Sequence, residues 1–190
     1  MAAIGAAPPA RHSVTRLASD RNLYHFVTRW RLPGTCEEIS DVLEDTEQIP
    51  RWWPSVYREV HIVRAGGLHS LGKVVDVVTK GALPYSLRWQ YEVVEQRYPN
   101  GWRLIARGDL EGEGRWEIEQ TGPSVDVTYN WRVRANHPLI RKLGLIMRPL
   151  FKANHVWTMR DGERGLRKQL AQLHFALRQA QGDNRDGWSC

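Results

Sequence analysis

Seven segments of the chain alternate apolar and polar residues with a period of two, and this pattern constrains the fold more than any other feature. In the clearest case, Tyr85–Val93, every second residue is Tyr, Leu, Trp, Tyr or Val, with polar residues between them. Because side chains along a strand point alternately to opposite faces, such a segment is typical of a strand with one apolar face. Turns such as Pro33-Gly34 and Pro99-Asn100-Gly101 separate the segments, which favours antiparallel hairpins. The predicted strands are residues 23–32, 56–64, 73–80, 85–93, 102–106, 109–119 and 125–134.

Helical signals interrupt this pattern after the first predicted strand. Thr35 precedes Glu38 by three residues, which is the spacing of a capping box, and residues 39–43 then carry a short apolar stripe. A tight turn follows at Arg51–Trp53, bracketed by two prolines. We therefore expect two short helices between the first and second strands.

A long helical segment follows the last predicted strand. After Pro138 the apolar residues recur every three or four positions. Pro149 is expected to kink or divide this helix, because proline lacks the backbone N–H that an interior turn needs. The main part is predicted to run from about residue 149 to about residue 180. Its inward stripe is predicted to consist of Leu143, Ile146, Met147, Leu150, Phe151, Asn154, Trp157, Thr158 and Asp161.

Two glycines indicate how the sheet is shaped. Gly112 and Gly114 lie on the apolar face of one predicted strand, where glycine is unfavourable unless the sheet bends sharply. The order of elements then predicts an α+β fold, in which a curved seven-stranded antiparallel sheet wraps around the long C-terminal helix. A length of 190 residues suits one such domain. We place it at residues 22–181, with disordered tails at 1–21 and 182–190.

The positive charge is concentrated near the C-terminus. Residues 137–180 carry a net charge of +7, whereas the rest of the chain carries −1. Such a segment attracts phosphates, nucleic acid or anionic lipid headgroups, or it forms a solvated basic helix face. The first twenty residues lack the apolar core of a signal peptide, and Cys36 and Cys190 imply no disulfide framework. These features predict a cytoplasmic protein.

Motifs for nucleotide, metal and nucleophilic chemistry are incomplete in this chain. Gly67–Lys73 has the spacing of a P-loop, but Val74 lacks the hydroxyl that would bind magnesium, and a predicted strand follows in place of a helix. The seven histidines form no group at ligand spacing, so we expect no metal site and no cofactor. Cys36 has no evident histidine partner. The strand aromatics share their face with Leu, Val and Ile, which argues against a nucleic-acid platform.

Three sequence phrases resemble a known family. Leu83–Trp89 (LPYSLRW), Gly108–Gly112 (GDLEG) and Asn154–Leu166 (NHVWTMRDGERGL) resemble the polyketide cyclase/dehydrase-like branch of the START-related helix-grip superfamily, also called SRPBCC. The resemblance covers about residues 22–175 and implies the helix-grip fold. It implies little about activity, because the superfamily includes lipid carriers, hormone receptors, cyclases and ring-hydroxylase subunits. The iron site of the ring hydroxylases is not expected, since the required histidine and carboxylate grouping is missing.

A bent sheet and a long helix enclose more space than their side chains fill, so this arrangement predicts a ligand cavity. The nine tryptophans of the chain would supply flat apolar walls with a few polar handles. On the C-terminal helix we expect Asn154 to face the cavity, and His155 to be rotated away from it by about 100°. The predicted ligand-binding residues are Trp52, Trp53, Trp89, Tyr91, Trp116, Tyr129, Trp131, Met147, Phe151, Asn154 and Trp157.

Binding of a hydrophobic small molecule, whether aromatic, polycyclic or an acyl chain, is the function that these features favour. A cyclase needs a poised acid or base, and the predicted inward residues offer only tyrosines and Asp161. Two alternatives stay open: an aldol-type cyclase or dehydratase acting on a polyketide, and a lipid shuttle that docks on anionic membrane through its basic helix. No catalytic residue is singled out, and no nucleic-acid partner is expected.

Overall fold

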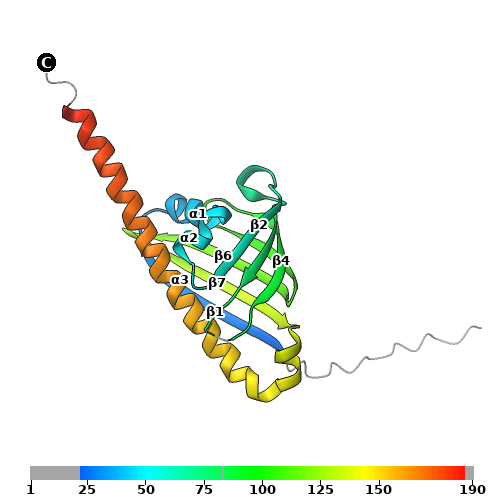
Figure 1. The fold of residues 1–190 in the computed structure, drawn as a ribbon. Helices are drawn as coiled ribbons and strands as arrows, with labels where there is room; N and C mark the ends of the chain where they lie inside the picture. Colours follow the sequence, from blue (N-terminus) through cyan, green and yellow to red (C-terminus); the bar gives the residue numbers. More distant parts are fainter. Residues whose placement is uncertain (1–21, 83, 187–190) are drawn as a thin grey trace, which may run out of the picture.

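The computed structural model describes residues 22–82 and 84–186, and the expected tail at 1–21 lies outside them. Figure 1 shows a strongly curved sheet with the long helix α3 running across its open side and the short helices α1 and α2 near one end. The elements are β1 (Leu23–Pro33), α1 (Cys36–Glu44), the 3₁₀ turn η1 (Thr46–Gln48), α2 (Ile49–Trp52), β2 (Tyr57–Arg64), the 3₁₀ turn η2 (Leu68–Ser70), β3 (Val74–Thr79), β4 (Leu87–Gln96), β5 (Gly101–Gly108), β6 (Leu110–Thr121), β7 (Ser124–Ala135) and α3 (Pro138–Asp186).

The sheet has seven antiparallel strands in the order β1-β7-β6-β5-β4-β3-β2, which confirms the predicted strand number and fold class. Each strand after β2 pairs with its predecessor in the chain, as expected for successive hairpins. The first strand is the exception, because β1 pairs with β7 over its whole length. This pairing brings the beginning of the described chain beside the strand that leads into α3.

Glycine on β6 allows the close approaches that the curved sheet needs. At Gly112 φ is +156°, and a Cβ atom there would lie 2.1 Å from the backbone oxygen of Arg132 on β7. At Gly114 a Cβ atom would lie 2.7 Å from the hydroxyl oxygen of Tyr129. Neither position accepts a side chain without displacing its neighbour, so the glycines permit both the bend and the packing of rings on the inner face.

The predicted capping box begins α1. The Glu38 N–H donates to Thr35 Oγ1 at 3.3 Å, and the Thr35 N–H donates to Glu38 Oε2 at 2.9 Å. A second short helix, α2, has Pro50 in its first turn, where the missing N–H costs nothing. This turn places Trp52 and Trp53, both buried, beneath α3.

Helix α3 differs from its prediction in extent. It is assigned as one helix from Pro138 to Asp186, so Pro149 does not divide it. Figure 1 shows its first turns, in yellow, running at a sharp angle to the long straight part. The helix also continues past its expected end at about residue 180 and past the predicted domain boundary at 181, and residues 187–190 lie outside the description. Within the described part of the chain, no helix is long and apolar enough to cross a membrane.

The face that α3 turns toward the sheet also differs from the prediction. Phe151, Met159 and Leu166 are buried, whereas Leu150 and Trp157 are exposed. The inward line continues through two glycines: a Cβ at Gly162 would strike the ring of Trp53, and one at Gly165 would lie 2.1 Å from the backbone oxygen of Trp52. Because glycine gives no hydrophobic signal, the apolar pattern alone placed the stripe about one residue away from the packed face.

Candidate functional site

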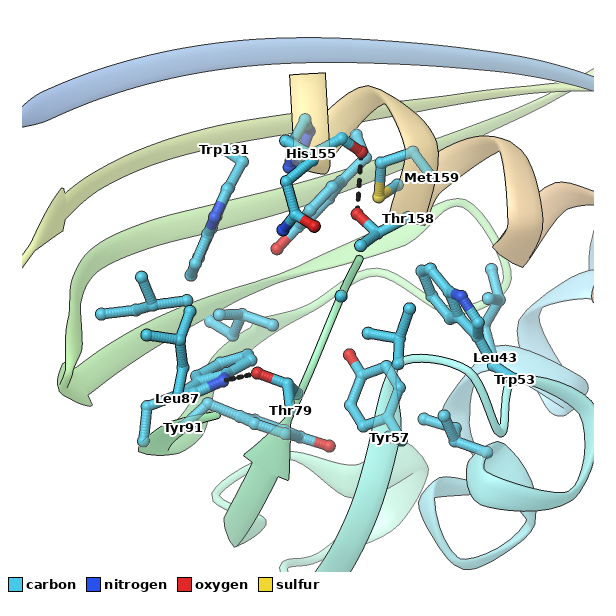
Figure 2. Close-up of a pocket in the computed structure, with 18 of the residues that line it drawn as sticks. Leu43, Trp53, Tyr57, Thr79, Leu87, Tyr91, Trp131, His155, Thr158 and Met159 are labelled. Atoms are coloured by element: carbon cyan, nitrogen blue, oxygen red, sulfur yellow. Dashed lines mark hydrogen bonds between the residues drawn. The ribbon is translucent and has the colours of Figure 1, made fainter. Parts of the chain in front are cut away.

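A cavity of about 140 Å³ lies between the inner face of the sheet, the α2 turn and the middle of α3. Figure 2 shows side chains from all of these elements pointing toward this space. Nine of the predicted ligand-binding residues line the cavity. They are Trp52, Trp53, Trp89, Tyr91, Trp116, Tyr129, Trp131, Phe151 and Asn154.

Two predicted site residues do not take part in the described lining. Trp157 is 40% exposed and absent from the lining, because it lies on the outward side of α3. Met147 is within α3, but its side chain lies outside the described residues. The inward positions of this helix are instead filled by Phe151, Thr158 and Met159.

Stacked rings form the wall of the cavity on the sheet side. Trp116 stacks on Tyr129 with ring centroids 4.1 Å apart and an interplanar angle of 21°. Tyr129 stacks in turn on Trp131 at 5.8 Å and 20°. On the opposite wall, Trp52 and Trp53 stack at 5.6 Å and 22°. Rings that pack against one another lose little further freedom when a ligand contacts them, so these walls are largely preformed.

The lining carries no formal charge at neutral pH. None of the described lining residues is Asp, Glu, Lys or Arg. Burial raises the pKa of Tyr91 to about 12, despite a hydrogen bond with Thr46 that lowers it. Burial likewise raises the pKa of Tyr57 and of Tyr129, and repulsion from the neighbouring tyrosines adds to both shifts. All three phenols are therefore neutral hydrogen-bonding groups.

Asn154 has a backbone partner. Its Oδ1 accepts a hydrogen bond from the Ala82 N–H at 2.8 Å, which ties α3 to the loop between β3 and β4. A Cβ on Gly81 would strike the Asn154 amide, so the loop approaches the helix closely here. The amide thus holds the cavity wall together as well as lining it.

His155 also lines the cavity, so the prediction that Asn154 alone would do so is wrong. Its ring stacks on Phe26 of β1 with centroids 3.9 Å apart and an angle of 17°. Figure 2 shows His155 on the helix side of the cavity, next to Thr158 and Met159. Burial lowers the pKa of His155 to about 4, so the imidazole is neutral at pH 7.

Comparisons with solved structures agree on this architecture. A protein from Thermus thermophilus matches with a TM-score of 0.67 and 17% identity, over 79% of this chain and 99% of the other. A START superfamily protein from Mycobacterium smegmatis matches at 0.62 and 17%, over 78% and 98%. The Zhui aromatase/cyclase from Streptomyces sp. R1128 matches at 0.60 and 15%, over 79% and 94%. The chain has the helix-grip fold.

The predicted resemblance to START-related and polyketide cyclase proteins is thus confirmed in the fold. No family model matches the sequence, and no curated protein matches it. At identities of 17% and below, the likeness establishes the helix-grip architecture and leaves ligand and activity to the residues of the site.

Several residues that line the cavity were not among the predicted ligand-binding residues, although Thr158 was on the predicted inward stripe of the C-terminal helix. Tyr57, Thr79, Thr158 and Met159 line it together with His155. Thr79 Oγ1 accepts a hydrogen bond from Trp89 Nε1 at 3.0 Å, and Thr158 Oγ1 donates to the His155 backbone oxygen at 2.7 Å. The Thr79 hydroxyl is small and lies among apolar residues, so the sequence pattern gave little sign of it, whereas the helical period did place Thr158 on the inward side.

The structure gives no support to a metal site, a reactive cysteine or a P-loop in the described part of the chain. In the described ranges, no group of three or more His, Cys, Asp or Glu residues is arranged to hold a metal ion. Burial raises the pKa of the Cys36 thiol, and nearby Glu37 and Glu119 add to the shift, which disfavours the reactive thiolate. The glycine-rich segment before Lys73 leads through η2 into β3 and not into a helix, so it lacks the N-terminal helix dipole of a P-loop.

Proposed function

We propose that this protein binds a neutral hydrophobic small molecule in the helix-grip cavity. The observation that carries the proposal is the lining itself, in which stacked aromatic rings enclose about 140 Å³ without any Asp, Glu, Lys or Arg among the described lining residues. Such a cavity binds an uncharged ligand favourably, because a buried ion would lose its hydration without a counter-charge.

The volume favours a ligand with one or two rings. An engineered cavity of about 150 Å³ accommodates benzene, so this cavity in its present form suits a substituted benzene or a small bicyclic compound. A polycyclic compound or a long acyl chain requires the lining side chains to move apart. We therefore place small aromatic compounds ahead of the other two ligand classes.

Binding is a better proposal than catalysis by a cyclase. The neighbours include proteins named as an aromatase/cyclase and as a norcoclaurine synthase, so the fold is compatible with ring chemistry. A general base works best when its pKa lies near the working pH. His155, with a pKa near 4 and its ring packed on Phe26, is a weak base in this setting.

The binding proposal is tested with naphthalene by isothermal titration calorimetry. We expect saturable binding to the wild-type protein and at least tenfold weaker binding to Met159→Trp, because the larger side chain occupies the cavity. Val156→Trp is the matched control, since Val156 is exposed on the same helix and is absent from the cavity lining. Equal binding by both variants, or no saturable heat with a panel of one- and two-ring aromatics, contradicts the proposal.

A second candidate, peripheral docking on anionic membrane, has support from the outward side of α3. Trp157 is 40% exposed and Phe175 is 57% exposed, and the exposed side chains of Arg160, Arg164 and Lys168 lie on the same side at helical spacing. Large apolar side chains interleaved with cations are typical of a surface that meets lipid headgroups.

The acidic residues of this stretch are engaged elsewhere. Asp161 accepts a hydrogen bond from Ser55, and Glu163 pairs with Arg167 at 2.8 Å. Among the basic residues, Arg148 has its Cζ atom 5.5 Å from the centroid of the Tyr24 ring. We therefore do not include Arg148 in the docking surface. The docking surface that we propose is therefore the outward line from Trp157 to Phe175.

Vesicle co-sedimentation tests this second candidate. Binding should rise with the phosphatidylserine content of phosphatidylcholine vesicles and fall with salt, because each cation near the surface contributes about 1 kcal/mol. Arg164→Glu should weaken it more than Arg29→Glu, which changes an exposed arginine on β1 by the same charge. Equal binding to neutral vesicles, or equal effects of the two variants, contradicts docking through α3.

A further inference from the structure

Three tyrosines from widely separated strands meet at the cavity. Tyr57 lies at the start of β2, Tyr91 lies in β4 and Tyr129 lies in β7, and all three line the same space. Each ring is fixed by an aromatic neighbour: Tyr57 by Trp53 at 5.4 Å, Tyr91 by Trp89 at 5.9 Å and Tyr129 by Trp116 at 4.1 Å. The rings are held in place, so the positions of their hydroxyls are set by the fold.

The three hydroxyls differ in their partners. Tyr91 pairs with Thr46 Oγ1 at 3.2 Å. The hydroxyls of Tyr57 and Tyr129 make no hydrogen bond within residues 22–82 and 84–186, and neither is among the buried polar atoms that the protein covers completely. Two accessible hydroxyls without a protein partner in one apolar cavity can both donate hydrogen bonds to a ligand atom.

The surrounding structure leaves room for these hydroxyls. Any side chain at Gly114 would meet the Tyr129 hydroxyl, since a Cβ there would lie only 2.7 Å from it. Figure 2 shows the hydroxyl of Tyr57 pointing into the cavity between Thr79 and Trp53. The Tyr129 hydroxyl thus lies next to Gly114 on the inner face of the sheet, and both tyrosines line the same space.

The other hydroxyl and side-chain amide groups of the described lining are engaged. Thr79, Asn154 and Thr158 already make the hydrogen bonds described above. The ring nitrogens Trp52 Nε1, Trp53 Nε1 and His155 Nε2 have no partner in the described part of the chain, but protein atoms cover them. Among the hydroxyl groups of the described lining, this leaves those of Tyr57 and Tyr129 without a protein partner.

The chemistry of these two contacts limits the ligand group that they recognise. A phenol that stays neutral donates a hydrogen bond, and two donors suit an oxygen atom with two lone pairs. A carboxylate or ammonium group does not fit, because the described lining holds no counter-charge for it. A carbonyl oxygen is uncharged, accepts two hydrogen bonds and donates none.

We propose that the hydroxyls of Tyr57 and Tyr129 together bind the carbonyl oxygen of a neutral aromatic ketone or aldehyde held in the cavity. This inference rests on the proposed binding function and adds the chemical class of the ligand. The ring of the ligand packs against the stacked aromatic wall, and its carbonyl group points toward β2 and β7.

A matched pair of probes isolates the contribution of the carbonyl group. Acetophenone and α-methylstyrene have nearly the same shape, but the first has a carbonyl oxygen where the second has a methylene carbon. We expect calorimetry to show acetophenone binding at least about fivefold tighter, as two hydrogen bonds of ordinary net strength predict. The infrared carbonyl band of bound acetophenone should shift to lower wavenumber relative to the ketone in an apolar solvent.

Removal of single hydroxyls tests the residues themselves. Tyr57→Phe and Tyr129→Phe keep the rings, so each should weaken acetophenone binding by about two- to tenfold and leave α-methylstyrene within about twofold. Each should also reduce the infrared shift. Tyr98→Phe is the control, because its hydroxyl bonds to Asp41 outside the cavity, and it should change neither probe.

The outcomes separate this inference from the proposed function. The carbonyl inference is overturned if α-methylstyrene binds and acetophenone binds no tighter than it does. It is also overturned if acetophenone keeps its full wild-type preference over α-methylstyrene in both Tyr57→Phe and Tyr129→Phe. In either case the cavity remains a hydrophobic binding site. If neither probe binds to the wild-type protein, both proposals are overturned together. An unshifted carbonyl band overturns the inference even if a variant fails to fold.

Discussion

The two faces of the sheet come from alternate residues of the same strands, yet they differ completely in chemistry. On the concave face, Trp116, Tyr129 and Trp131 stack on one another and line the cavity. On the convex face, Arg103 pairs with Glu95 at 3.0 Å and with Glu113 at 3.5 Å, all within reach of solvent. Neighbouring residues in the chain therefore serve different purposes.

This difference indicates which face determines stability and binding. Exposed ion pairs contribute little, because water screens them and the side chains lose freedom to form them. Buried rings remove a large apolar area from water, and they also form the preformed walls of the cavity. On the concave side a change in charge, volume or hydrogen bonding should therefore have a larger effect.

The largest expected effect is the loss of stability when the buried imidazole of His155, on the concave side, becomes protonated. The pKa of His155 is lowered to about 4, whereas the unfolded chain binds a proton near its ordinary value of about 6.5. Between these values the unfolded state binds more protons, so stability falls as pH falls through this window and levels off below it. The wild-type protein should lose about 3 kcal/mol relative to His155→Phe between pH 7.5 and pH 4.

Urea unfolding of both proteins at several pH values measures this difference. The other histidines are common to the two proteins, so their contributions cancel in the comparison. A wild-type curve that runs parallel to that of His155→Phe would mean that the buried imidazole gains a partner when it is charged.

A smaller but still large effect is expected where α3 packs on the α2 turn. A Cβ at Gly165 would lie 2.1 Å from the backbone oxygen of Trp52, which cannot move without shifting the turn. Gly165→Ala should therefore destabilise the protein by about 2 kcal/mol, although alanine is the better helix former. Ala171→Ser, at an exposed position of the same helix, should change stability by less than about 0.5 kcal/mol.

Gly162→Ala sharpens this test because its neighbour is a side chain. The atoms nearest to a Cβ at Gly162 belong to the ring of Trp53, which can turn toward the cavity. We expect a smaller loss of stability than for Gly165→Ala, together with weaker naphthalene binding. Unfolding curves and calorimetry on the same two variants check both parts, and equal losses of stability would contradict the difference.

An intermediate effect is expected at the hydrogen bond that joins α3 to the β3–β4 loop. Asn154→Ala leaves the Ala82 N–H without its acceptor, and it should cost about 1 kcal/mol of stability. Asn154→Asp keeps the acceptor oxygen and should lose less at neutral pH. Denaturant midpoints of the two variants distinguish the cases, and equal loss in both would show that the hydrogen bond is not the cause.

The strands could be predicted from sequence because the concave and convex faces impose a period of two. Tyr57 was missed for a physical reason: the pairing of β2 with β3 shifts register between Tyr57 and Glu59. This bulge breaks the alternation, so Tyr57 and Val60 both pack toward the core although their positions have opposite parity. A strand with an irregular pairing cannot be phased from its apolar residues alone.

The phase of α3 could not be predicted for a related reason. Leu150 and Trp157 gave the strongest apolar signal but are exposed, while Gly162 and Gly165 lie on the packed side with no side chain to indicate it. The partners that select the inward line, Trp52 and Trp53, come from a turn more than a hundred residues earlier. Periodicity within one segment carries no information about such partners.

The smallest expected effect lies on the convex face and completes the comparison. Arg64 Nη2 lies 2.7 Å from Glu92 Oε1, with the two side chains 58% and 30% exposed. A double-mutant cycle with Arg64→Ala and Glu92→Ala should give a coupling free energy below about 1 kcal/mol, falling further as salt is added. The parallel cycle with Trp116→Ala and Tyr129→Ala, on the stacked pair of the concave face, should give a coupling that salt does not change, because ring contacts do not depend on ionic screening. A coupling of Arg64 with Glu92 that equals the ring coupling in high salt would contradict the assignment of stability to the concave face.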